Sequence, residues 1–390
     1  MKVTGIKTFL VHPQSPHAGM IGGKNWLFVK VETDEGIAGW GECYTQLDRD
    51  KAIEQHVHAM KRYVLESDPF NIKYLTRSVY DDFAGRRGSM DLFSALSGIE
   101  QALWDIVGKA LGQPVYRLLG GACRAKVRVY ANGWYGGAQT PDQYAEMAAA
   151  TAQRGFTALK FDPFPGPWRL YVDRKVEQTA VANVRAVREA VGADVDLLIE
   201  VHRRLAPMHA IRVSHLLEQF QPFWYEEPVP VTNVGALTEV RRQTSIPVVT
   251  GETLYQKSDL YPVLEHRAAD ILNPDVCSCG GILELKEMAA MAEPYMVVMS
   301  PHNYNSTTIG LAATLQVAAC IPNFLITEYF VNFTETGNEI ADQPFVVENS
   351  AITLPSRPGL GIELNEEALR QRPYRELPKR SLPGYVQESP

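Results

Sequence analysis

Eight short apolar runs, separated by stretches with helical spacing of apolar residues, occupy most of this 390-residue chain beyond residue 126. Runs of this length bounded by polar and turn residues are typical of buried strands. Strand–helix alternation repeated eight times predicts an α/β fold, a parallel β/α barrel. The predicted strands cover residues 127–133, 157–163, 195–201, 222–228, 246–252, 270–275, 296–303 and 324–329.

The intervening stretches carry residues typical of helix ends. Thr140 precedes Pro141, which places a helix cap before a proline at the first helical position, and Gly155 closes the stretch. After the eighth strand no clear long helix follows. Residues 356–390 are rich in proline and polar groups, and we expect them to run back over the N-terminal domain.

The chain before the barrel has a different pattern, which predicts an α+β domain over residues 1–125. Residues 25–42 form two apolar runs around an Asp34-Glu35-Gly36 turn, a hairpin signal. Residues 90–112 carry apolar residues at helical spacing and end at a glycine. We therefore predict an N-terminal domain completed by the C-terminal segment, and a barrel domain over residues 126–355.

Composition excludes several classes of function. The net charge of −7, with no run of lysine or arginine, argues against a nucleic-acid binder. No apolar run approaches the roughly 18 residues that span a bilayer, and the first residues alternate like a strand instead of a signal peptide. The five cysteines are scattered, as in a reduced compartment. We expect a cytoplasmic homo-oligomer that acts on a small molecule, with no nucleic-acid or membrane partner.

Ionisable residues recur at the ends of the last six predicted strands. Their intervals of 23 to 27 residues correspond to one strand–helix unit each. Carboxyl ends of barrel strands meet at one rim, where barrel active sites lie. A single such residue is more often a solvated strand end, but six in phase are hard to attribute to chance. The six residues are Glu200, Glu226, Glu252, Asp275, His302 and Glu328.

The first three of these side chains form a candidate metal site. Three carboxylates that converge on one point repel one another and are costly to desolvate, and a divalent cation removes that cost. Ligation by carboxylates alone selects a hard ion. We therefore predict Mg²⁺, with Mn²⁺ as a close alternative, bound by Glu200, Glu226 and Glu252.

Four further residues belong to the candidate site. Asp275 and His302 end neighbouring strands, so a hydrogen bond between them would fix the imidazole tautomer and raise its basicity. Lys160 ends the second strand and is either a surface lysine or a group that binds a substrate carboxylate or stabilises negative charge. His202 follows Glu200 by two residues and lies on the same side if the chain stays extended.

The chain resembles the enolase superfamily, within its mandelate racemase/muconate lactonizing enzyme-like subgroup. The resemblance covers nearly the whole length. It is carried by "SGIEQALWDIVGKALGQPVYRLLGG", "GFTALKFD", "WYEEP", "TGE", "NPD", "SPHN" and "ITEY". It implies a modified (β/α)7β TIM barrel with an N-terminal α+β capping domain.

The resemblance also implies roles for the candidate residues. Glu226, and not Glu227, would be the middle metal ligand. His302 with Asp275 would be the general-base pair that takes a proton α to a carboxylate, an assignment in keeping with the Lys or His bases of this superfamily. Glu328 would contact the enolic oxygen from the side opposite the metal.

Two departures from the subgroup pattern favour a dehydratase. Many members carry K-x-K on the second strand, whereas this chain has Lys160-Phe161-Asp162, which disfavours a two-base racemase. The third strand reads E-x-H, where galactonate and mannonate dehydratases have D-x-H. In galactonate-dehydratase-like enzymes that histidine, here His202, is the general acid that protonates the departing hydroxide. Glutamate in place of aspartate lengthens the ligand arm by one methylene.

The sequence thus predicts Mg²⁺-dependent dehydration of a sugar acid, an aldonate such as galactonate or a related aldarate, to a 2-keto-3-deoxy acid. The alternative is a cycloisomerase or an epimerase/racemase of a related acid or lactone that uses the same enediolate. A non-catalytic barrel is a more distant alternative. Substrate specificity would come from the capping domain, where residues 12–26 form a candidate lid. Arg86 and Arg87 are either ligands for a distal polyol or carboxylate, or part of a solvated turn.

Overall fold

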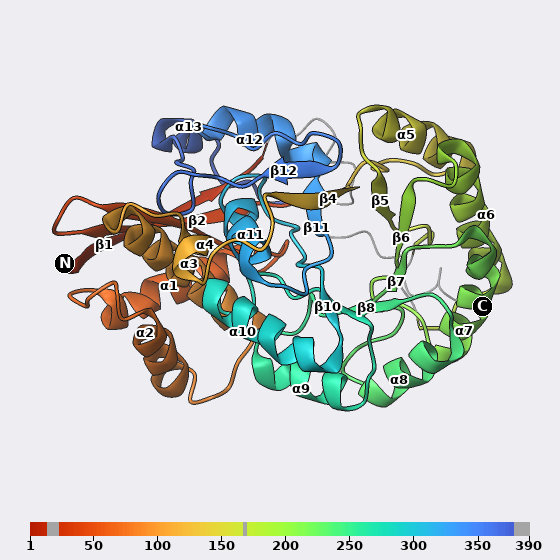
Figure 1. The fold of residues 1–390 in the computed structure, drawn as a ribbon, viewed down its shortest axis with the longest axis horizontal. Coiled ribbons are helices and arrows are strands. Elements are labelled where there is room, and N and C mark those ends of the chain that lie inside the picture. The colour runs from red at the N-terminus through yellow and green to blue at the C-terminus, as the bar shows by residue number, and fades with distance from the viewer. Residues whose placement is uncertain (14–22, 167–169, 378–390) are drawn as a thin grey trace.

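The computed structural model describes residues 1–13, 23–166 and 170–377 of the chain. Its larger sheet contains eight parallel strands, all within this described part, in the spatial order β10-β9-β8-β7-β6-β5-β4-β11. Figure 1 shows these strands at the centre of the larger lobe. They are β4 (Lys126–Asn132), β5 (Ala158–Phe161), β6 (Asp196–Glu200), β7 (Trp224–Glu226), β8 (Val248–Thr250), β9 (Ile271–Leu272), β10 (Val298–Met299) and β11 (Thr327–Phe330).

Backbone hydrogen bonds join the two ends of this sheet. Met299 on β10 donates to the carbonyl of Asn323 and accepts from the amide of Leu325, both at 2.8 Å, just before β11. The sheet therefore closes into a barrel and leaves no open edge between β10 and β11. A short strand, β12 (Ala351–Thr353), pairs antiparallel with β4 outside the ring.

One α-helix follows each barrel strand from β4 to β10, and Figure 1 shows α5 to α9 along the outer side of the strands. This order confirms the predicted (β/α)7β barrel. Thr140 caps α5 in a capping box with Gln143, as the sequence predicted. The helices are α5 (Pro141–Gln153), α6 (Arg174–Val191), α7 (Pro207–Leu217), α8 (Val234–Gln243), α9 (Lys257–Glu265), α10 (Ile282–Ala292) and α11 (Ile309–Cys320). Single turns η2 (Glu218–Phe220), η3 (Glu293–Tyr295) and η4 (Val331–Phe333) and helix α12 (Thr334–Ile340) complete this part.

The N-terminal part has its own antiparallel sheet and its own apolar core. The predicted hairpin is confirmed, since β2 and β3 pair antiparallel on either side of the Asp34–Gly36 turn. The strands are β1 (Val3–Val11), β2 (Trp26–Thr33) and β3 (Ala38–Cys43). The helices are α1 (Asp50–Val64), α2 (Ile72–Ser78), the π-turn η1 (Val79–Phe83), α3 (Met90–Ala110) and α4 (Val115–Leu118).

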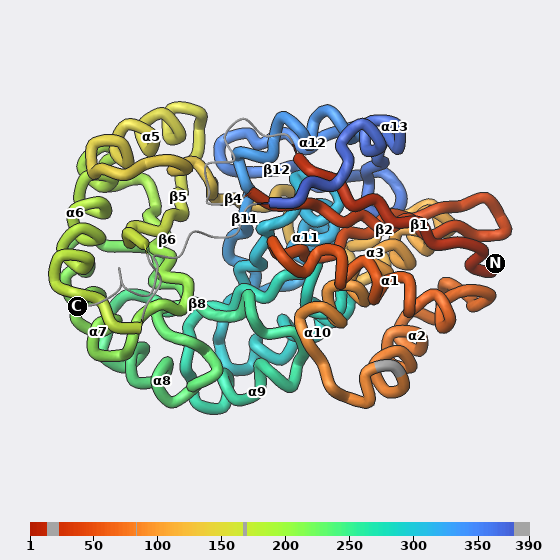
Figure 2. Tube along the Cα trace, turned by 180° about the vertical axis from the view of Figure 1, so that it is seen from behind, coloured from red at the N-terminus to blue at the C-terminus, as the bar shows by residue number. Residues whose placement is uncertain are grey.

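The C-terminal segment returns to the N-terminal sheet. Figure 2 shows α13 (Glu366–Arg370) beside β1 and β2, although the segments lie far apart in sequence. Lys30 on β2 pairs with Glu366 at 2.6 Å, and the amide of His12 donates to the carbonyl of Arg372 at 3.1 Å. The segment thus completes the N-terminal sheet region. The domain boundaries at residues 125 and 355 stay predictions.

Most strands are shorter than the sequence predicted. The apolar run 246–252 contributes only the three residues of β8 to the sheet, and the run 296–303 only the two residues of β10. The residues beyond these strands turn into the loops at the carboxyl end of the barrel. Glu252, Asp275 and His302 therefore lie on loops two or three residues past a strand, where they can approach one another.

None of the described helices is both long enough and apolar enough to cross a membrane. All five cysteines are free thiols, so no disulfide stabilises the fold.

The N-terminal sheet packs unusually closely on α3, which leads to a test of the fold. A Cβ built on Gly41 of β3 would lie far inside the van der Waals radius of the Gly98 carbonyl on α3. We expect Gly41→Ala to destabilise the protein by about 1–3 kcal/mol or more, because backbone has to move to admit the methyl group. Gly235→Ala, at an exposed site in α8, is the control and should be neutral or stabilising. Chemical denaturation of both variants measures the difference, and equal stability would contradict the close packing.

Candidate active site

Three glutamates meet at the carboxyl end of the barrel. Glu200 and Glu226 are the last residues of adjacent strands and pair directly in register, so their side chains point to the same face. Glu252 reaches the same point from the loop after β8. One carboxylate oxygen from each lies within 4.8 Å of the other two. The structure therefore brings together the three residues that the sequence predicts as metal ligands.

Lys160 on β5 lies beneath this cluster and is 2% exposed. Its Nζ is 2.9 Å from Glu226, 3.3 Å from Glu328 and 3.4 Å from Glu200. Burial alone would lower the pKa of Lys160, but the carboxylates of Glu226 and Glu328 outweigh it and raise the pKa well above its usual value. Lys160 is therefore a charged group inside the site and not a surface lysine.

Lys160 does not provide hydrogen bonds for every carboxylate oxygen of the cluster. Oε2 of Glu200 and Oε2 of Glu226 are buried and make no hydrogen bond to a described residue. Burial, together with the charge of Glu200, raises the pKa of Glu226. Buried, unsatisfied carboxylate oxygens that face one another fit a hard divalent cation, since oxygen ligands are what such ions require.

The longer arm of Glu200 has a visible consequence. Its Oε1 accepts hydrogen bonds from the backbone amides of Val201 at 3.0 Å and His202 at 2.7 Å. These bonds hold one oxygen of the carboxylate and leave Oε2 directed at the cluster. The Glu200 carboxylate therefore uses one oxygen to order the backbone after β6 and keeps the other for the cluster.

Glu227, the neighbour of Glu226, points away from the cluster, which agrees with the implied choice of Glu226, and not Glu227, as the middle ligand. Its Oε1 accepts from Thr250 Oγ1 at 2.8 Å and from the Gly251 amide at 3.0 Å. Arg203 lies between Glu227 and Glu252 and forms a hydrogen-bonded ion pair with Glu252. Burial would raise the pKa of Glu252, but the Arg203 guanidinium and the His302 ring outweigh it and hold that pKa well below its ordinary value.

Asp275 and His302 form the predicted pair. They face each other across an isolated parallel bridge, and His302 Nδ1 lies 2.7 Å from Asp275 Oδ2. Because a carboxylate only accepts, Nδ1 carries the proton and Nε2 is directed into the site. Nε2 lies 3.2 Å from Glu252 and 3.4 Å from Glu328. Burial would lower the pKa of His302, but Glu328 and Glu252 outweigh it and raise the pKa.

Glu328 on β11 closes the other side of the site. It accepts from the side-chain amide of Asn132 at 2.6 Å and from the backbone amide of Asn303 at 2.9 Å. Burial would raise the pKa of Glu328, but Lys160 and His302 outweigh it and lower the pKa. Glu328 therefore lies between a lysine and a histidine, 3.3 Å from Lys160 Nζ and 3.4 Å from His302 Nε2.

His202 reaches the site by a different route from the one predicted. The chain does not stay extended after Glu200, because His202 and Arg203 adopt left-handed backbone conformations with φ of 54° and 62°. The turn brings His202 Nδ1 to 2.8 Å from Asp162 Oδ2 and 4.0 Å from Glu200. The carboxylate of Asp162 fixes Nδ1 as the donor, so the ring presents Nε2.

Asp162 is the main residue whose role the sequence did not predict. Besides His202, it accepts from the buried guanidinium of Arg204 and from the Phe164 amide at 3.0 Å. Its position two residues after Lys160, directly after β5, was the available signal, since a K-x-K motif would place its second lysine there. Asn273 was also missed; its side-chain amide donates to Glu226 at 2.7 Å.

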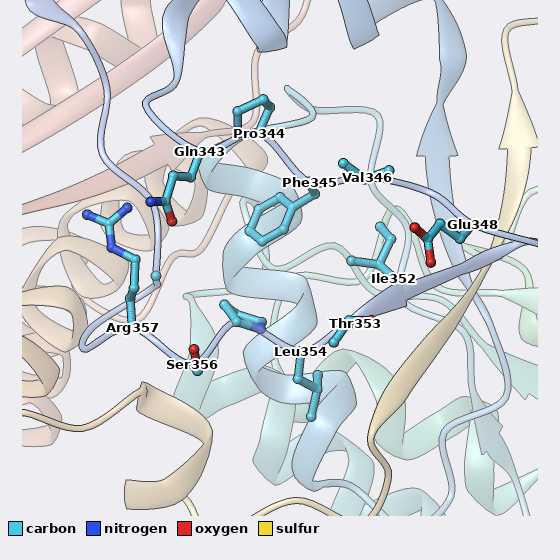
Figure 3. Close-up of a pocket in the computed structure, with 12 residues that line it drawn as sticks. Gln343, Pro344, Phe345, Val346, Glu348, Ile352, Thr353, Leu354, Ser356 and Arg357 are labelled. Carbon is cyan, nitrogen blue, oxygen red and sulfur yellow. The ribbon is translucent and has the colours of Figure 1, made fainter.

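The remaining sequence candidates lie elsewhere or outside the described chain. Most of the predicted lid, residues 14–22, falls outside the described residues. Arg86 lies on the surface and pairs with Asp81 at 3.1 Å. A pocket of about 300 Å³ opens beside β12, and Figure 3 shows its residues grouped around the ring of Phe345, from Arg357 on one side to Glu348 on the other. It contains none of the predicted site residues.

Comparison with known proteins agrees with this arrangement. Residues 5–120 match the mandelate racemase/muconate lactonizing enzyme N-terminal domain, and residues 143–368 match the enolase C-terminal domain-like family. The chain belongs to the mandelate racemase/muconate lactonizing enzyme family of the enolase superfamily. The predicted family and fold are thereby confirmed.

Two curated relatives in this family carry the name of a dehydratase. The chain is 36% identical over 380 residues to the D-galactonate dehydratase of Ralstonia pickettii, covering 95% of this chain and 94% of the relative. It is 34% identical over 349 residues to the D-gluconate/D-galactonate dehydratase of Picrophilus torridus, covering 89% and 88%. A solved mandelate racemase/muconate lactonizing enzyme from Jannaschia sp. has a TM-score of 0.89 at 34% identity, covering 96% and 98%.

The adjacent residues Glu226 and Glu227 allow a matched test of cation binding, because only Glu226 belongs to the cluster. A divalent cation should stabilise the folded protein by about 2.7 kcal/mol at 100 times its dissociation constant, and a chelator should reverse the effect. Glu226→Gln should lose most of this stabilisation because it removes a cluster carboxylate. Glu227→Gln should keep it. Thermal unfolding with and without MgCl₂ measures both, and equal responses of the two variants would contradict the assignment.

Proposed function

We propose that this protein is a Mg²⁺-dependent dehydratase of a sugar acid that produces a 2-keto-3-deoxy acid. A six-carbon aldonate such as D-galactonate or D-gluconate is the favoured substrate, since these are the substrates named for its curated relatives. The observation that carries the proposal is the pair of histidines beside the carboxylate cluster, each held by its own aspartate.

The cofactor proposal rests on the cluster itself. Glu200, Glu226 and Glu252 would hold Mg²⁺, which fits their hard oxygen donors and their unsatisfied buried oxygens. When bound, the ion supplies positive charge that acidifies the proton α to a substrate carboxylate and stabilises the developing enediolate.

His302 acts as the general base in this mechanism. Its Nε2 takes the α-proton, while Asp275 accepts the Nδ1 hydrogen bond and stabilises the imidazolium that forms. Lys160 lies on the floor of the site, where its charge stabilises negative charge on the substrate. Glu328 lies close to both Lys160 and His302, and it contacts the enolic oxygen of the intermediate.

His202 acts as the general acid. Asp162 accepts a hydrogen bond from Nδ1, and the ring acts as an imidazolium that also carries a proton on Nε2. Nε2 gives this proton to the 3-hydroxyl, which leaves as water, and the neutral ring remains. The resulting enol tautomerises to the 2-keto-3-deoxy acid. Asp162 occupies the position where a second lysine would serve a two-base racemase, which supports elimination over the racemase or epimerase alternative.

The proposed function is tested by its product. The purified protein should be screened against a stereochemical library of aldonic and aldaric acids with MgCl₂, and 2-keto-3-deoxy acid should appear with at least one of them. Chelation should stop the reaction. An isomer of the substrate in place of a dehydrated product would instead support the cycloisomerase or epimerase alternative.

The two histidines should separate the two halves of the reaction. His302→Asn should lower turnover by about 10²–10⁴-fold or more and stop exchange of the α-proton with deuterated solvent, because the base is lost. His202→Asn should lose dehydration to a similar degree, whereas the α-proton still exchanges. Proton NMR in D₂O follows both processes at once. Normal water elimination by His202→Asn would contradict its role as the acid.

A further inference from the structure

A buried carboxylate of the N-terminal domain contacts the loop that carries His302. Glu42, on β3, is 1% exposed and accepts three hydrogen bonds from the loop after β10 and from the first turn of α11. The donors are the Ser306 amide at 2.8 Å, Ser306 Oγ at 2.5 Å and the Gly310 amide at 2.7 Å. A carboxylate with this many donors is a strong anchor in a buried environment.

The same loop also binds Asp275, the aspartate of the Asp275–His302 pair. Asn305, directly before Ser306, donates from its side-chain amide to both carboxylate oxygens of Asp275 at 2.9 Å. Asp275 in turn accepts the hydrogen bond from His302. A shift of the Ser306 backbone would therefore move Asn305 and change the hydrogen bonds that orient Asp275.

The loop after Asp275 is tied to the same point on β3. Gln101, on α3, exchanges hydrogen bonds with the backbone of Glu42 and donates to the Val276 carbonyl at 3.2 Å. The Tyr44 amide donates to the carbonyl of Cys277 at 2.9 Å. The loops that follow Asp275 and His302 are thus both attached to the end of β3 in the N-terminal domain.

There is little room for these contacts to rearrange. A Cβ on Gly310 would lie 2.6 Å from Asn305 Cβ and 3.0 Å from Glu42 Oε2. Close packing of this kind transmits a displacement instead of absorbing it. Asn305, Ser306 and Asp275 are themselves fully or almost fully buried.

We propose that Glu42 is a positioning residue that orients the Asp275–His302 pair, acting through Ser306 and Asn305. The N-terminal domain would then contribute to the reacting geometry of the barrel as well as cover it. The kinetic part of this inference rests on the proposed dehydratase function, whereas the structural part does not.

The structural part is tested by NMR of protein labelled with ¹⁵N-histidine in MgCl₂. The Nδ1 proton that His302 donates to Asp275 should resonate far downfield, and its signal is assigned by its loss in His302→Asn. In Glu42→Gln this proton should shift and exchange with water at least about tenfold faster, because the aspartate is less well held. The glutamine side chain of this variant would carry an N–H group in place of one carboxylate oxygen. It could therefore no longer accept all the hydrogen bonds that Ser306 and Gly310 donate.

Glu100→Gln is the matched control. Glu100 is also a buried carboxylate of the N-terminal domain, and it accepts from the amides of Ile282 and Leu283 at the start of α10. It makes the same kind of contact between domains, but its hydrogen bonds go to α10 and not to the loops that carry Asp275 and His302. We expect this variant to lose stability while the His302 proton and turnover stay within twofold of the wild type.

The kinetic arm uses substrate deuterated at the α-carbon. Glu42→Gln should lower kcat by about 10- to 100-fold with little change in KM, a loss typical of partners that orient functional groups. The isotope effect on kcat should rise, because proton abstraction becomes slower than the other steps. A purely structural role would lower the melting temperature without changing the isotope effect.

The outcomes separate the two proposals. If the wild type converts no sugar acid, the proposed function fails, and the NMR comparison still decides the role of Glu42. If Glu42→Gln keeps the exchange rate of the His302 proton and the isotope effect of the wild type, the positioning role is overturned. Should Glu42→Gln fail to fold, Ser306→Ala removes one of the three hydrogen bonds and should change both readouts in the same direction, and unchanged readouts overturn the proposal.

Discussion

The repulsion among buried carboxylates at the barrel rim is the constraint on which the rest of the site depends. Glu200, Glu226 and Glu252 converge within a few ångströms, and Glu328 lies on the far side of Lys160. Such a group is costly to bury unless positive charge or strong donors compensate it. Lys160 supplies part of that charge from below, and the orphaned oxygens of the cluster leave a place for a cation. The three glutamates, Lys160 and His302 are therefore one electrostatic unit.

The loops around this unit are stabilised by more than the barrel. Short strands such as β9 and β10 place Asp275 and His302 on loops, which would be mobile if only their own strands held them. Glu42 and Gln101, from the N-terminal domain, supply hydrogen bonds that these short strands do not. The two domains are thus joined where the chemistry needs rigidity, and the tight packing of α3 on β3 fixes the strand end that carries Glu42.

Much of this arrangement could be predicted from the sequence because barrel strands repeat with a regular interval. The period of one strand–helix unit picked out the three glutamates of the cluster. It also placed Asp275 and His302 at the ends of neighbouring strands, and the structure brings Asp275 Oδ2 and His302 Nδ1 to 2.7 Å. The position of His202 could not be decided in this way, because strand periodicity applies only while the chain remains extended. A left-handed turn after Glu200 cannot be read from residues that are not glycine.

The sequence by itself determined the fold and the identities of the groups at the rim, since apolar periodicity and the spacing of strand ends are local properties of the chain. Only the tertiary structure decided which partner each group has. Asp162 holds His202 from 40 residues away, and Asn305 holds Asp275 from 30 residues away. Glu42 binds Ser306, in the loop that follows His302, across 264 residues. Hydrogen bonds of this kind depend on distances of a few tenths of an ångström between distant segments, and no local pattern encodes those distances.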